Sequence, residues 1–293
     1  MSENCCNHHP NLHHDMSSPD RYAVIGNPIS QTKSPLIHMA FAQEAGQDMI
    51  YTAIEGPIGR FAETVDAFRA GGGKGLNVTV PFKLDACAYA TDLSDEARAA
   101  GAANALKFEG GRAWAQNFDG VGLVRDIVHN LGQPLAGRRV LLLGAGGAAR
   151  GAILPILRQG PARLYVANRS VDKVQQLVRQ FLAQGASDRL EGGGYADLGT
   201  DSFDVVINAT SASLSASALP LPASAFAADG LAYDMVYGKG LTPFLGLARQ
   251  AGVRQIAEGA GMLVEQAAEA FAWWRGVRPG TRAMIARIGS PLV

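Results

Sequence analysis

The chain has 293 residues, of which 47% are hydrophobic, 18% are charged and 35 are glycine, a composition typical of a soluble globular protein. Its length favours two domains over one. Lys plus Arg and Asp plus Glu number 26 each, and this zero net charge argues against a nucleic-acid binder, because such proteins carry a basic excess. No apolar run reaches the ~18 residues of a membrane span, and the odd number of cysteines, three, gives no disulfide framework. We therefore expect a cytoplasmic protein that binds neither membrane nor nucleic acid.

Residues 1–20 are predicted to be a disordered tail, because they contain too few hydrophobic residues to order them. Cys and His are the ligands that zinc and copper prefer, so a metal-binding role is the alternative. No second ligand pair follows at the spacing of a zinc finger, and we predict no metal site. The side chains concerned are Cys5, Cys6, His8, His9, His13 and His14.

Folded structure is predicted to begin with an apolar strand near residues 21–28. Ser34 and Pro35 are typical of a helix start, with Ser34 as the cap and Pro35 in the first helical position. The spacing of Leu36 and Met39 places both on one face of this helix.

The stretch GLNVTVPFK, residues 75–83, predicts a strand over 75–80 with one apolar and one polar face, because hydrophobic and polar residues alternate along it. Pro81 ends the strand, since proline has no N–H to give to a sheet. Lys83 follows just past that end, where α/β folds keep their sites. An arbitrary lysine in such a place is usually only solvated, which is the alternative interpretation.

A hairpin is predicted over residues 104–120, turning at Gly110-Gly111, and Asp119 then lies at the N-cap of a helix that runs to about Asn130. A lysine and an aspartate together can exchange a proton with an alcohol or a ketone. We therefore predict that Asp119 converges with Lys83, the alternative being that Asp119 is a plain helix cap.

From residue 138 the pattern changes to a doubly wound α/β region. The stretch RRVLLLGAGGAARGAILPIL is typical of a buried parallel strand running into a helix. A further helix is predicted at about 171–181, and a final, Ala-rich one at 259–275. Further apolar strands are predicted at 163–167, 204–208, 231–235 and 253–257.

The GAGGAA segment places Gly144, Gly146 and Ala149 in the G-x-G-x-x-G/A pattern of dinucleotide-binding sites. In that pattern the glycines let a pyrophosphate approach the backbone, and the helix N-terminus supplies N–H groups to it. The alternative is a glycine-rich structural turn, but the position between an apolar strand and a helix favours the dinucleotide site.

The end of the next strand predicts NADP rather than NAD. NAD sites usually carry Asp or Glu there to bind the ribose hydroxyls, whereas this chain has Asn168, Arg169, Ser170 and, one turn later, Lys173. Two cations and a hydroxyl suit a 2′-phosphate. The alternative is a solvated basic helix start.

Many short stretches resemble the shikimate dehydrogenase family, in one order from about Tyr22 to Trp274. They are VIGNPISQTKSP, GGKGLNVTVPFK, GAANAL, NFDGVGL, GAGGAARG, NRS, INATS, YDMVYGKGLTPFL and EGAGMLVEQAAEAF.

The resemblance implies an α/β fold of two domains. An α/β substrate-binding domain is expected over 21–119, completed by the C-terminal residues 259–293, and a Rossmann-like doubly wound NADP-binding domain over 120–258. The implied reaction is the reversible, NADP-dependent reduction of 3-dehydroshikimate to shikimate, on the route to chorismate and the aromatic amino acids. A paralogue acting on quinate, and a catalytically inactive NADP-binding regulator, are the alternatives. A monomer or a homodimer is expected.

The resemblance also implies roles for single residues. Lys83 and Asp119 match the catalytic pair. Residues matching the substrate site are Thr32, Ser34, Thr79, Asn104, Tyr237 and Gln266. Residues matching cofactor contacts are Gly144, Ala145, Gly146, Gly147, Ala148, Asn168, Arg169, Ser170, Lys173, Met235 and Gly259.

Four residues depart from the family pattern. Thr32 stands in place of a serine and adds a methyl group beside the expected substrate carboxylate. Phe118 replaces the threonine before Asp119, and we expect it near the substrate as well. Ser213 replaces a glycine. Lys173 replaces an arginine, and this change weakens the expected binding of the 2′-phosphate, because lysine is a point charge rather than a planar fork.

Overall fold

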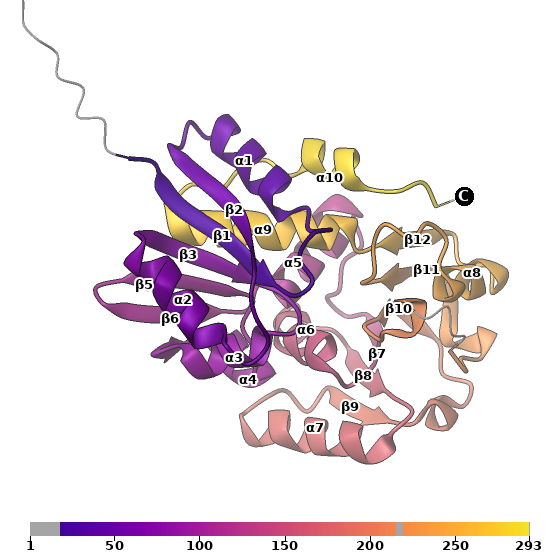
Figure 1. The fold of residues 1–293 in the computed structure, drawn as a ribbon. Coiled ribbons are helices and arrows are strands. Elements are labelled where there is room, and N and C mark those ends of the chain that lie inside the picture. Colours follow the sequence, from indigo (N-terminus) through magenta and orange to yellow (C-terminus); the bar gives the residue numbers. More distant parts are fainter. Residues whose placement is uncertain (1–17, 215–218, 293) are drawn as a thin grey trace, which may run out of the picture.

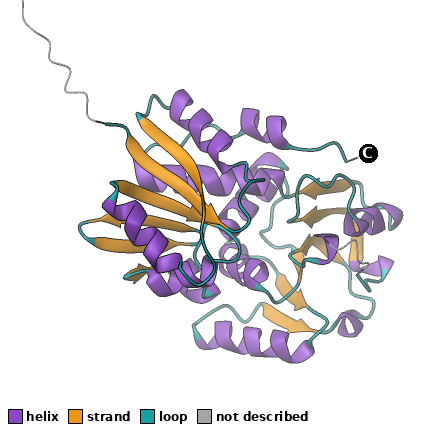
Figure 2. Ribbon diagram, in the orientation of Figure 1, coloured by secondary structure: helices purple, strands orange, loops and turns teal. Residues whose placement is uncertain are grey.

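The computed structural model describes residues 18–214 and 219–292. Two six-stranded sheets organise the chain, and helices flank both of them (Figures 1 and 2). The cysteine- and histidine-rich stretch from Cys5 to His14 lies outside the described residues. Within the described ranges, no helix is long and apolar enough to cross a membrane.

The first sheet, here the N-terminal sheet, has the strand order β2-β1-β3-β5-β6-β4. Strands β1, β2 and β3 are parallel, while β5 and β6 form an antiparallel hairpin in which Glu109 is opposite Arg112, as predicted for residues 104–120. Its strands are β1 (Asp20–Gly26), β2 (Met49–Glu55), β3 (Gly73–Val78), β4 (Asp92–Leu93), β5 (Ala105–Glu109) and β6 (Arg112–Gln116). The helices within this part are α1 (Ser34–Glu44), α2 (Phe61–Ala70), α3 (Lys83–Tyr89) and α4 (Asp95–Ala100).

Both faces of the N-terminal sheet are covered, so the middle of β1 is buried throughout. Tyr22 and Val24 pack with α1 and with two C-terminal helices, α9 (Ala260–Arg275) and α10 (Arg282–Ile288). Ala23 and Ile25 face the opposite way and pack with residues of α2, α3 and α4. The C-terminal helices therefore complete the core of a sheet that is built from the first part of the chain.

The second sheet, here the parallel sheet, has the order β12-β11-β10-β7-β8-β9, with every neighbouring pair parallel. Counted along the chain this is the 3-2-1-4-5-6 order of a doubly wound nucleotide-binding fold, so the predicted two-domain α/β fold is confirmed. Its strands are β7 (Arg139–Leu143), β8 (Arg163–Ala167), β9 (Leu190–Gly193), β10 (Phe203–Asn208), β11 (Phe226–Asp234) and β12 (Gln255–Glu258). The α-helices of this part are α5 (Asp119–Arg125), which is continued by a π-helical turn η1 (Asp126–Asn130), α6 (Gly147–Arg158), α7 (Val171–Ala183) and α8 (Pro243–Gln250). Short 3-10 turns are η2 (Tyr195–Leu198), η3 (Ala212–Leu214) and η4 (Ala223–Ala225).

Two elements in the first part of the chain differ from the prediction at their ends. Strand β3 ends at Val78, and Val80 is 65% exposed because residues 79–82 form a turn in which the Phe82 N–H bonds the Thr79 carbonyl at 3.0 Å. Helix α1 has Lys33 rather than Ser34 at its N-cap.

Leu36 and Met39 share one face of α1, as predicted, and this face is not the buried one. Leu36 and Met39 are 39% and 40% exposed, whereas Ile37 and Phe41 are buried. The reason is tertiary, since Phe41 packs edge-on against Phe271 of α9.

Candidate active site

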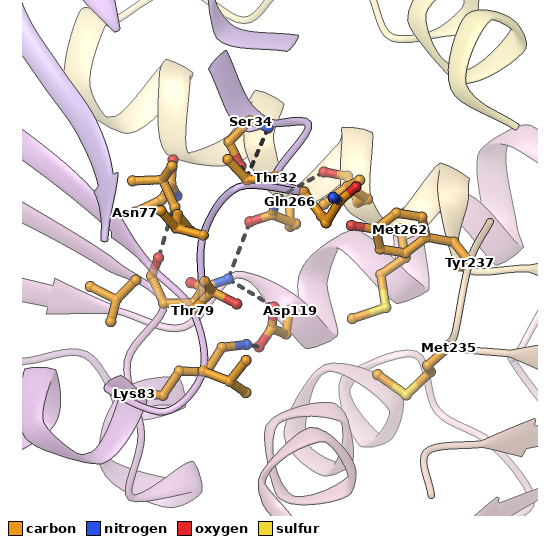
Figure 3. A pocket seen from close by; sticks show the side chains of 18 of the residues that line it. Thr32, Ser34, Asn77, Thr79, Lys83, Asp119, Met235, Tyr237, Met262 and Gln266 are labelled. Atoms are coloured by element: carbon orange, nitrogen blue, oxygen red, sulfur yellow. Dashed lines mark hydrogen bonds and ion pairs between the residues drawn. The ribbon is translucent and has the colours of Figure 1, made fainter. Parts of the chain in front are cut away.

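A cavity of about 360 Å³ is lined by residues from both halves of the chain (Figure 3). One wall is formed by the loop before α1, by the end of β3 and by Lys83, while the other is formed by the loop after β11 and the start of α9. The structure brings ten of the predicted residues together here. They are Thr32, Ser34, Thr79, Lys83, Asn104, Asp119, Met235, Tyr237, Gly259 and Gln266.

Lys83 and Asp119 form an ion pair that faces this cavity. Lys83 is the first residue of α3 and Asp119 the first of α5, and 2.5 Å separates Lys83 Nζ from Asp119 Oδ2. The Asp119 side chain is 13% exposed and that of Lys83 30% exposed. The predicted contact is present, although Phe118, not Asp119, is the N-cap of α5.

Three further hydrogen bonds fix the orientation of the aspartate. Asn104 donates from Nδ2 to Asp119 Oδ1 at 2.9 Å, and the Asp119 backbone N–H donates to Asn117 Oδ1 at 3.1 Å. Asn104 is itself held, because its Oδ1 accepts the Phe118 N–H at 2.8 Å. With one carboxylate oxygen bound by Asn104, the other is directed at the lysine.

Gln266 reaches this cluster because two helices pack closely. Its Oε1 accepts a hydrogen bond from Asn104 Nδ2 at 3.2 Å. An added Cβ at Gly122 of α5 would lie 2.7 Å from the Gln266 backbone nitrogen, a distance that real side chains do not adopt. The glycine therefore lets α9 lie against α5 and brings an amide from near the end of the chain to the Lys83–Asp119 pair.

Two hydroxyl groups lie at the opposite side of the cavity from Lys83 (Figure 3). Thr32 Oγ1 donates to Ser34 Oγ at 3.2 Å and accepts the Ser34 N–H at 3.3 Å. Because α1 starts here, these hydroxyls and the first N–H groups of the helix suit a small carboxylate.

Asn77, which was not among the predicted site residues, also lines the cavity and is only 5% exposed. Its Oδ1 accepts a hydrogen bond from the Tyr51 hydroxyl at 2.7 Å, and Tyr51 stacks on His38 with 4.2 Å between ring centroids. Complete burial lowers the pKa of His38 to about 3, so this imidazole is neutral at physiological pH. The place of Asn77 two residues before Thr79, on the polar side of the predicted strand, was the available sign.

Met262 and Leu263 line the cavity as well and were also missed. They lie one helical turn before Gln266 and just after Gly259, so the spacing of α9 indicated them once Gln266 was assigned. Gly259 has no room for a side chain, since an added Cβ would lie 2.2 Å from the Met235 carbonyl oxygen.

Phe118 lies outside the residues that line the cavity, which makes its predicted place near the substrate wrong. Phe118 is 9% exposed, and its ring packs edge-on against Trp273 of α9, with 5.8 Å between ring centroids. Asn117 and Asn104 already orient Asp119, so no hydroxyl at position 118 is needed for that purpose.

Phe118→Thr is therefore expected to lower stability and to leave activity unchanged. The loss should be about 2 kcal/mol, below the ~3–5 kcal/mol of a complete Phe→Ala truncation, because a small side chain would leave a cavity beside Trp273. Denaturant unfolding measures the first effect, and kcat/KM of the folded variant measures the second. A clear rise in kcat/KM would return Phe118 to the substrate site.

Ser213, another departure from the family pattern, belongs to a buried polar network below the cavity. Its hydroxyl donates to Asp234 Oδ2 at 2.5 Å and accepts from Asn208 Nδ2 at 3.1 Å. Asp234 is fully buried and also accepts from the Thr242 hydroxyl at 2.6 Å. The serine thus supplies a hydrogen bond to a buried carboxylate that a glycine lacks.

Ser213→Gly should destabilise the protein by about 1–3 kcal/mol, because Asp234 loses one donor without gaining access to water. Ser211→Gly is the matched control, since this serine is exposed two residues earlier and the change adds the same backbone freedom. Thermal or denaturant unfolding of both variants gives the difference. Equal losses would mean that the network does not depend on the Ser213 hydroxyl.

The predicted dinucleotide site lies at the carboxyl ends of β7 and β8, beside the cavity lining rather than in it. Gly144 has φ +111°, a conformation that favours glycine, and α6 begins at Gly147 without a side-chain cap. An added Cβ at Gly146 or Gly147 would meet no atom within 4 Å. Open space in front of uncapped N–H groups fits a pyrophosphate.

The start of α7 fits the additional phosphate of NADP. Ser170 is the N-cap, but its hydroxyl makes no capping hydrogen bond. Arg169 and Lys173 are exposed, and across the described residues neither takes part in an ion pair. A hydroxyl and two unpaired cations are thus available at one helix terminus. Within 18–214 and 219–292, no cluster of His, Cys, Asp and Glu could hold a metal ion.

Three family models match the chain in order. They are the shikimate dehydrogenase substrate binding domain over residues 24–106, the shikimate / quinate 5-dehydrogenase model over 126–216, and the shikimate 5′-dehydrogenase C-terminal domain over 259–288. Together they cover most of the chain, including most of the residues that line the cavity; Asp119, Met235 and Tyr237 fall between the matched ranges.

Individual proteins similar to this chain support the same family. The shikimate dehydrogenase (NADP(+)) of Dechloromonas aromatica is 55% identical over 94% of this chain and 99% of its own length. The crystal structure of an Ael1 enzyme from Pseudomonas putida has a TM-score of 0.90 at 57% identity, and the match covers 94% of this chain and 100% of that one. The shikimate 5-dehydrogenase of Thermus thermophilus, in complex with NADP(H) and shikimate, has a TM-score of 0.80 at 30% identity, covering 91% of this chain and 97% of that one. The chain belongs to the shikimate dehydrogenase family.

Proposed function

We propose that this protein is an NADP-dependent shikimate dehydrogenase, which reversibly reduces 3-dehydroshikimate to shikimate. The observation that carries the proposal is the Lys83–Asp119 ion pair, at 2.5 Å, opening into a cavity whose far side holds the Thr32 and Ser34 hydroxyls. A small ring with a carboxylate at one end and a reacting oxygen at the other fits this arrangement.

In this proposal Thr32 and Ser34 bind the substrate carboxylate. Asn104, Gln266, Thr79 and Tyr237 surround the ring hydroxyls, since all four line the cavity with polar groups. Burial raises the pKa of Tyr237, so its hydroxyl stays protonated and can donate. The ring is thereby oriented with its C3 oxygen toward Lys83.

Lys83 and Asp119 would handle the proton at that oxygen. In the reduction the Lys83 ammonium donates a proton to the C3 oxygen, and in the oxidation Lys83 takes it back. Asp119 keeps the ammonium at the cavity, because its Oδ2 bonds Lys83 Nζ while Asn104 holds its other oxygen. When bound, NADPH supplies the hydride through its nicotinamide ring.

The residues proposed to hold NADP follow the carboxyl ends of strands of the parallel sheet. Gly144 to Ala148 would bind the pyrophosphate, and Asn168, Arg169, Ser170 and Lys173 the 2′-phosphate end. Met235 and Gly259 line the cavity that contains Lys83, so they would contact the nicotinamide. In these terms the chain divides into a substrate part, 21–119 with 259–293, and an NADP part, 120–258.

The test is a matrix of shikimate and quinate against NADP and NAD, followed by the absorbance of the reduced cofactor. Shikimate with NADP is expected to give the highest kcat/KM. Quinate carries an extra hydroxyl on a tetrahedral C1 beside the carboxylate, where the Thr32 methyl narrows the site, and one methyl-sized group is worth about 1–3 kcal/mol of discrimination. Thr32→Ser should therefore narrow the gap between the two substrates.

Two outcomes of this matrix would overturn the proposal. A kcat/KM for quinate equal to or above that for shikimate would identify a quinate-oxidising paralogue. No reduction of either cofactor by either substrate, together with measurable NADP binding, would identify a regulator. A monomer or a homodimer is proposed as the active form, and sedimentation velocity distinguishes them.

A further inference from the structure

The loop between β11 and α8, residues 235–242, carries Tyr237 to the cavity. Asp234 anchors both of its ends, since Asp234 Oδ1 accepts the Val236 N–H at 3.2 Å and Oδ2 accepts the Thr242 hydroxyl at 2.6 Å. Thr242 in turn caps α8 by accepting the Leu245 N–H at 3.3 Å. The ends of the loop are thus fixed to the parallel sheet.

The Tyr237 side chain has no such anchor of its own. It is 36% exposed, and its hydroxyl makes no hydrogen bond to any residue that the structure describes. The position of Tyr237 over the cavity therefore depends on how the backbone beside it is held.

Glu258 holds that backbone. Its Oε2 accepts the N–H of Gly238, the residue after Tyr237, at 2.8 Å. Glu258 is the last residue of β12 and is 8% exposed, so its carboxylate is shielded from water by the loop. Gly238 has φ +72°, which turns the chain sharply at this point.

The other carboxylate oxygen of Glu258 binds the C-terminal segment, residues 289–292. Ser290 donates its backbone N–H to Glu258 Oε1 at 2.7 Å, and Arg249 of α8 donates to the Leu292 carbonyl. This segment follows α10, whose Met284 and Ile285 pack in the core of the N-terminal sheet. In Figure 1 it runs from α10 toward β12 and α8.

We propose that Glu258 is a positioning residue for the substrate site, which holds Tyr237 over the cavity by binding the Gly238 N–H. We further infer that the C-terminal segment is part of the same device, since it binds the second oxygen of the same carboxylate. The inference rests on the proposed function, in which Tyr237 contacts the substrate. It assigns Glu258 no contact with substrate or cofactor.

The chemistry of the site explains why a carboxylate is used. Two backbone N–H groups, from Gly238 and Ser290, converge on one side chain, and only a carboxylate offers two acceptor oxygens to both. Gln at this position keeps the shape but has a single acceptor oxygen, so it can bind only one of the two segments. Ala binds neither.

The experiment compares Glu258→Ala and a deletion of residues 290–293 with the unaltered protein, using shikimate and NADP. If the loop of Glu258→Ala holds Tyr237 in place for only about a tenth of the time, the KM of this variant for shikimate should rise about tenfold, with kcat little changed. The deletion removes one of the two donors and should raise KM less. Glu258→Gln replaces the Ala variant if that variant fails to fold.

A second background tests whether Glu258 acts through Tyr237. In Tyr237→Phe, which lacks only the hydroxyl, adding Glu258→Ala should change KM by less than about twofold, because coupled residues are not additive. Independent, multiplying effects on KM in the two backgrounds would overturn the proposal. So would an unchanged KM in a folded Glu258→Ala.

Asp204→Ala is the matched control. Asp204 also binds a backbone N–H with its carboxylate, that of Arg139 at 2.8 Å, but at the opposite end of the parallel sheet from Glu258. The substitution at Asp204 should lower the stability of the protein and leave the KM for shikimate unchanged. An equal rise in KM for both variants would reduce Glu258 to a general structural role.

Hydrogen exchange of the amides of residues 236–241 separates this inference from the proposed function. Exchange there should rise in Glu258→Ala and not in Asp204→Ala, whatever the substrate of the protein is. If the unaltered protein does not oxidise shikimate, the proposed function fails while the exchange data still test the role of Glu258. Unchanged exchange in Glu258→Ala would overturn the inference alone.

Discussion

Lys83→Ala is expected to lower kcat by roughly a hundredfold or more, the usual contribution of a positioned acid–base group. The reason is local, because the Lys83 ammonium is the cation that the Asp119 carboxylate holds at the cavity, 2.5 Å away. Alanine leaves Asp119 bound to Asn104 and Asn117, so the shape of the site should survive. Steady-state kinetics with shikimate and NADP measure the loss.

The fold should hardly respond to this change. Lys83 is partly exposed and outside the hydrophobic core, so the free energy of unfolding is expected to change by less than about 1 kcal/mol. Lys74→Ala is a suitable control, since Lys74 is an exposed lysine near the start of β3, the strand that precedes Lys83 in the chain. Near-normal turnover in a folded Lys83→Ala variant would remove Lys83 from the mechanism.

Arg169→Ala is expected to weaken NADP binding by about 1.5–3 kcal/mol, the value of a hydrogen bond to a charged group, or roughly tenfold to a hundredfold. NAD binding should stay almost unchanged, because NAD lacks the 2′-phosphate. Arg169 is available for this role, since it lies exposed at the start of α7 without an ion pair to any described residue. Lys173→Ala should act in the same direction but less strongly, since lysine cannot form a bidentate contact.

Dissociation constants for both cofactors, measured by titration without substrate, provide the test. Arg179→Ala is the control, because Arg179 is also exposed on α7 but lies further along the helix. Equal weakening of NADP and NAD by Arg169→Ala would mean that this side chain supports the loop and does not distinguish the cofactors.

Most strands of the parallel sheet were predictable to within two residues, but β11, predicted over 231–235, begins at Phe226. Strand β8 has the predicted bounds 163–167, and β10 and β12 start or end within two residues of the prediction. Parallel strands covered on both faces are continuous apolar runs, which a sequence shows directly. Strand β9 was missed because its sequence is LEGG, with a single apolar residue and two glycines.

The residues of the candidate site were predictable where they belong to a recognisable sequence motif, and not elsewhere. Lys83 and Asp119 were found because each follows a recognisable strand or hairpin, and the structure places them in contact. Asn77 was not assigned, because its position on the polar side of the predicted strand, two residues before Thr79, indicates a polar face but not the cavity beside it. The direction of Phe118 was misjudged, since its ring packs against Trp273 of α9, and the sequence did not show that the Leu36 face of α1 is exposed while Phe41 packs against α9.

The sequence by itself determined the two α/β halves, the glycine loop and the residue types of the site, because each depends on patterns within about thirty residues, the span of one βαβ unit. Only the tertiary structure decided how the halves meet. Asn104 and Gln266 are 162 residues apart and touch because Gly122 lets α9 lie against α5. Glu258 joins a loop of the parallel sheet to the C-terminal segment through two N–H groups. Contacts of this kind depend on which surfaces are packed together, and hydrophobic periodicity says which face of an element is buried but not what it is buried against.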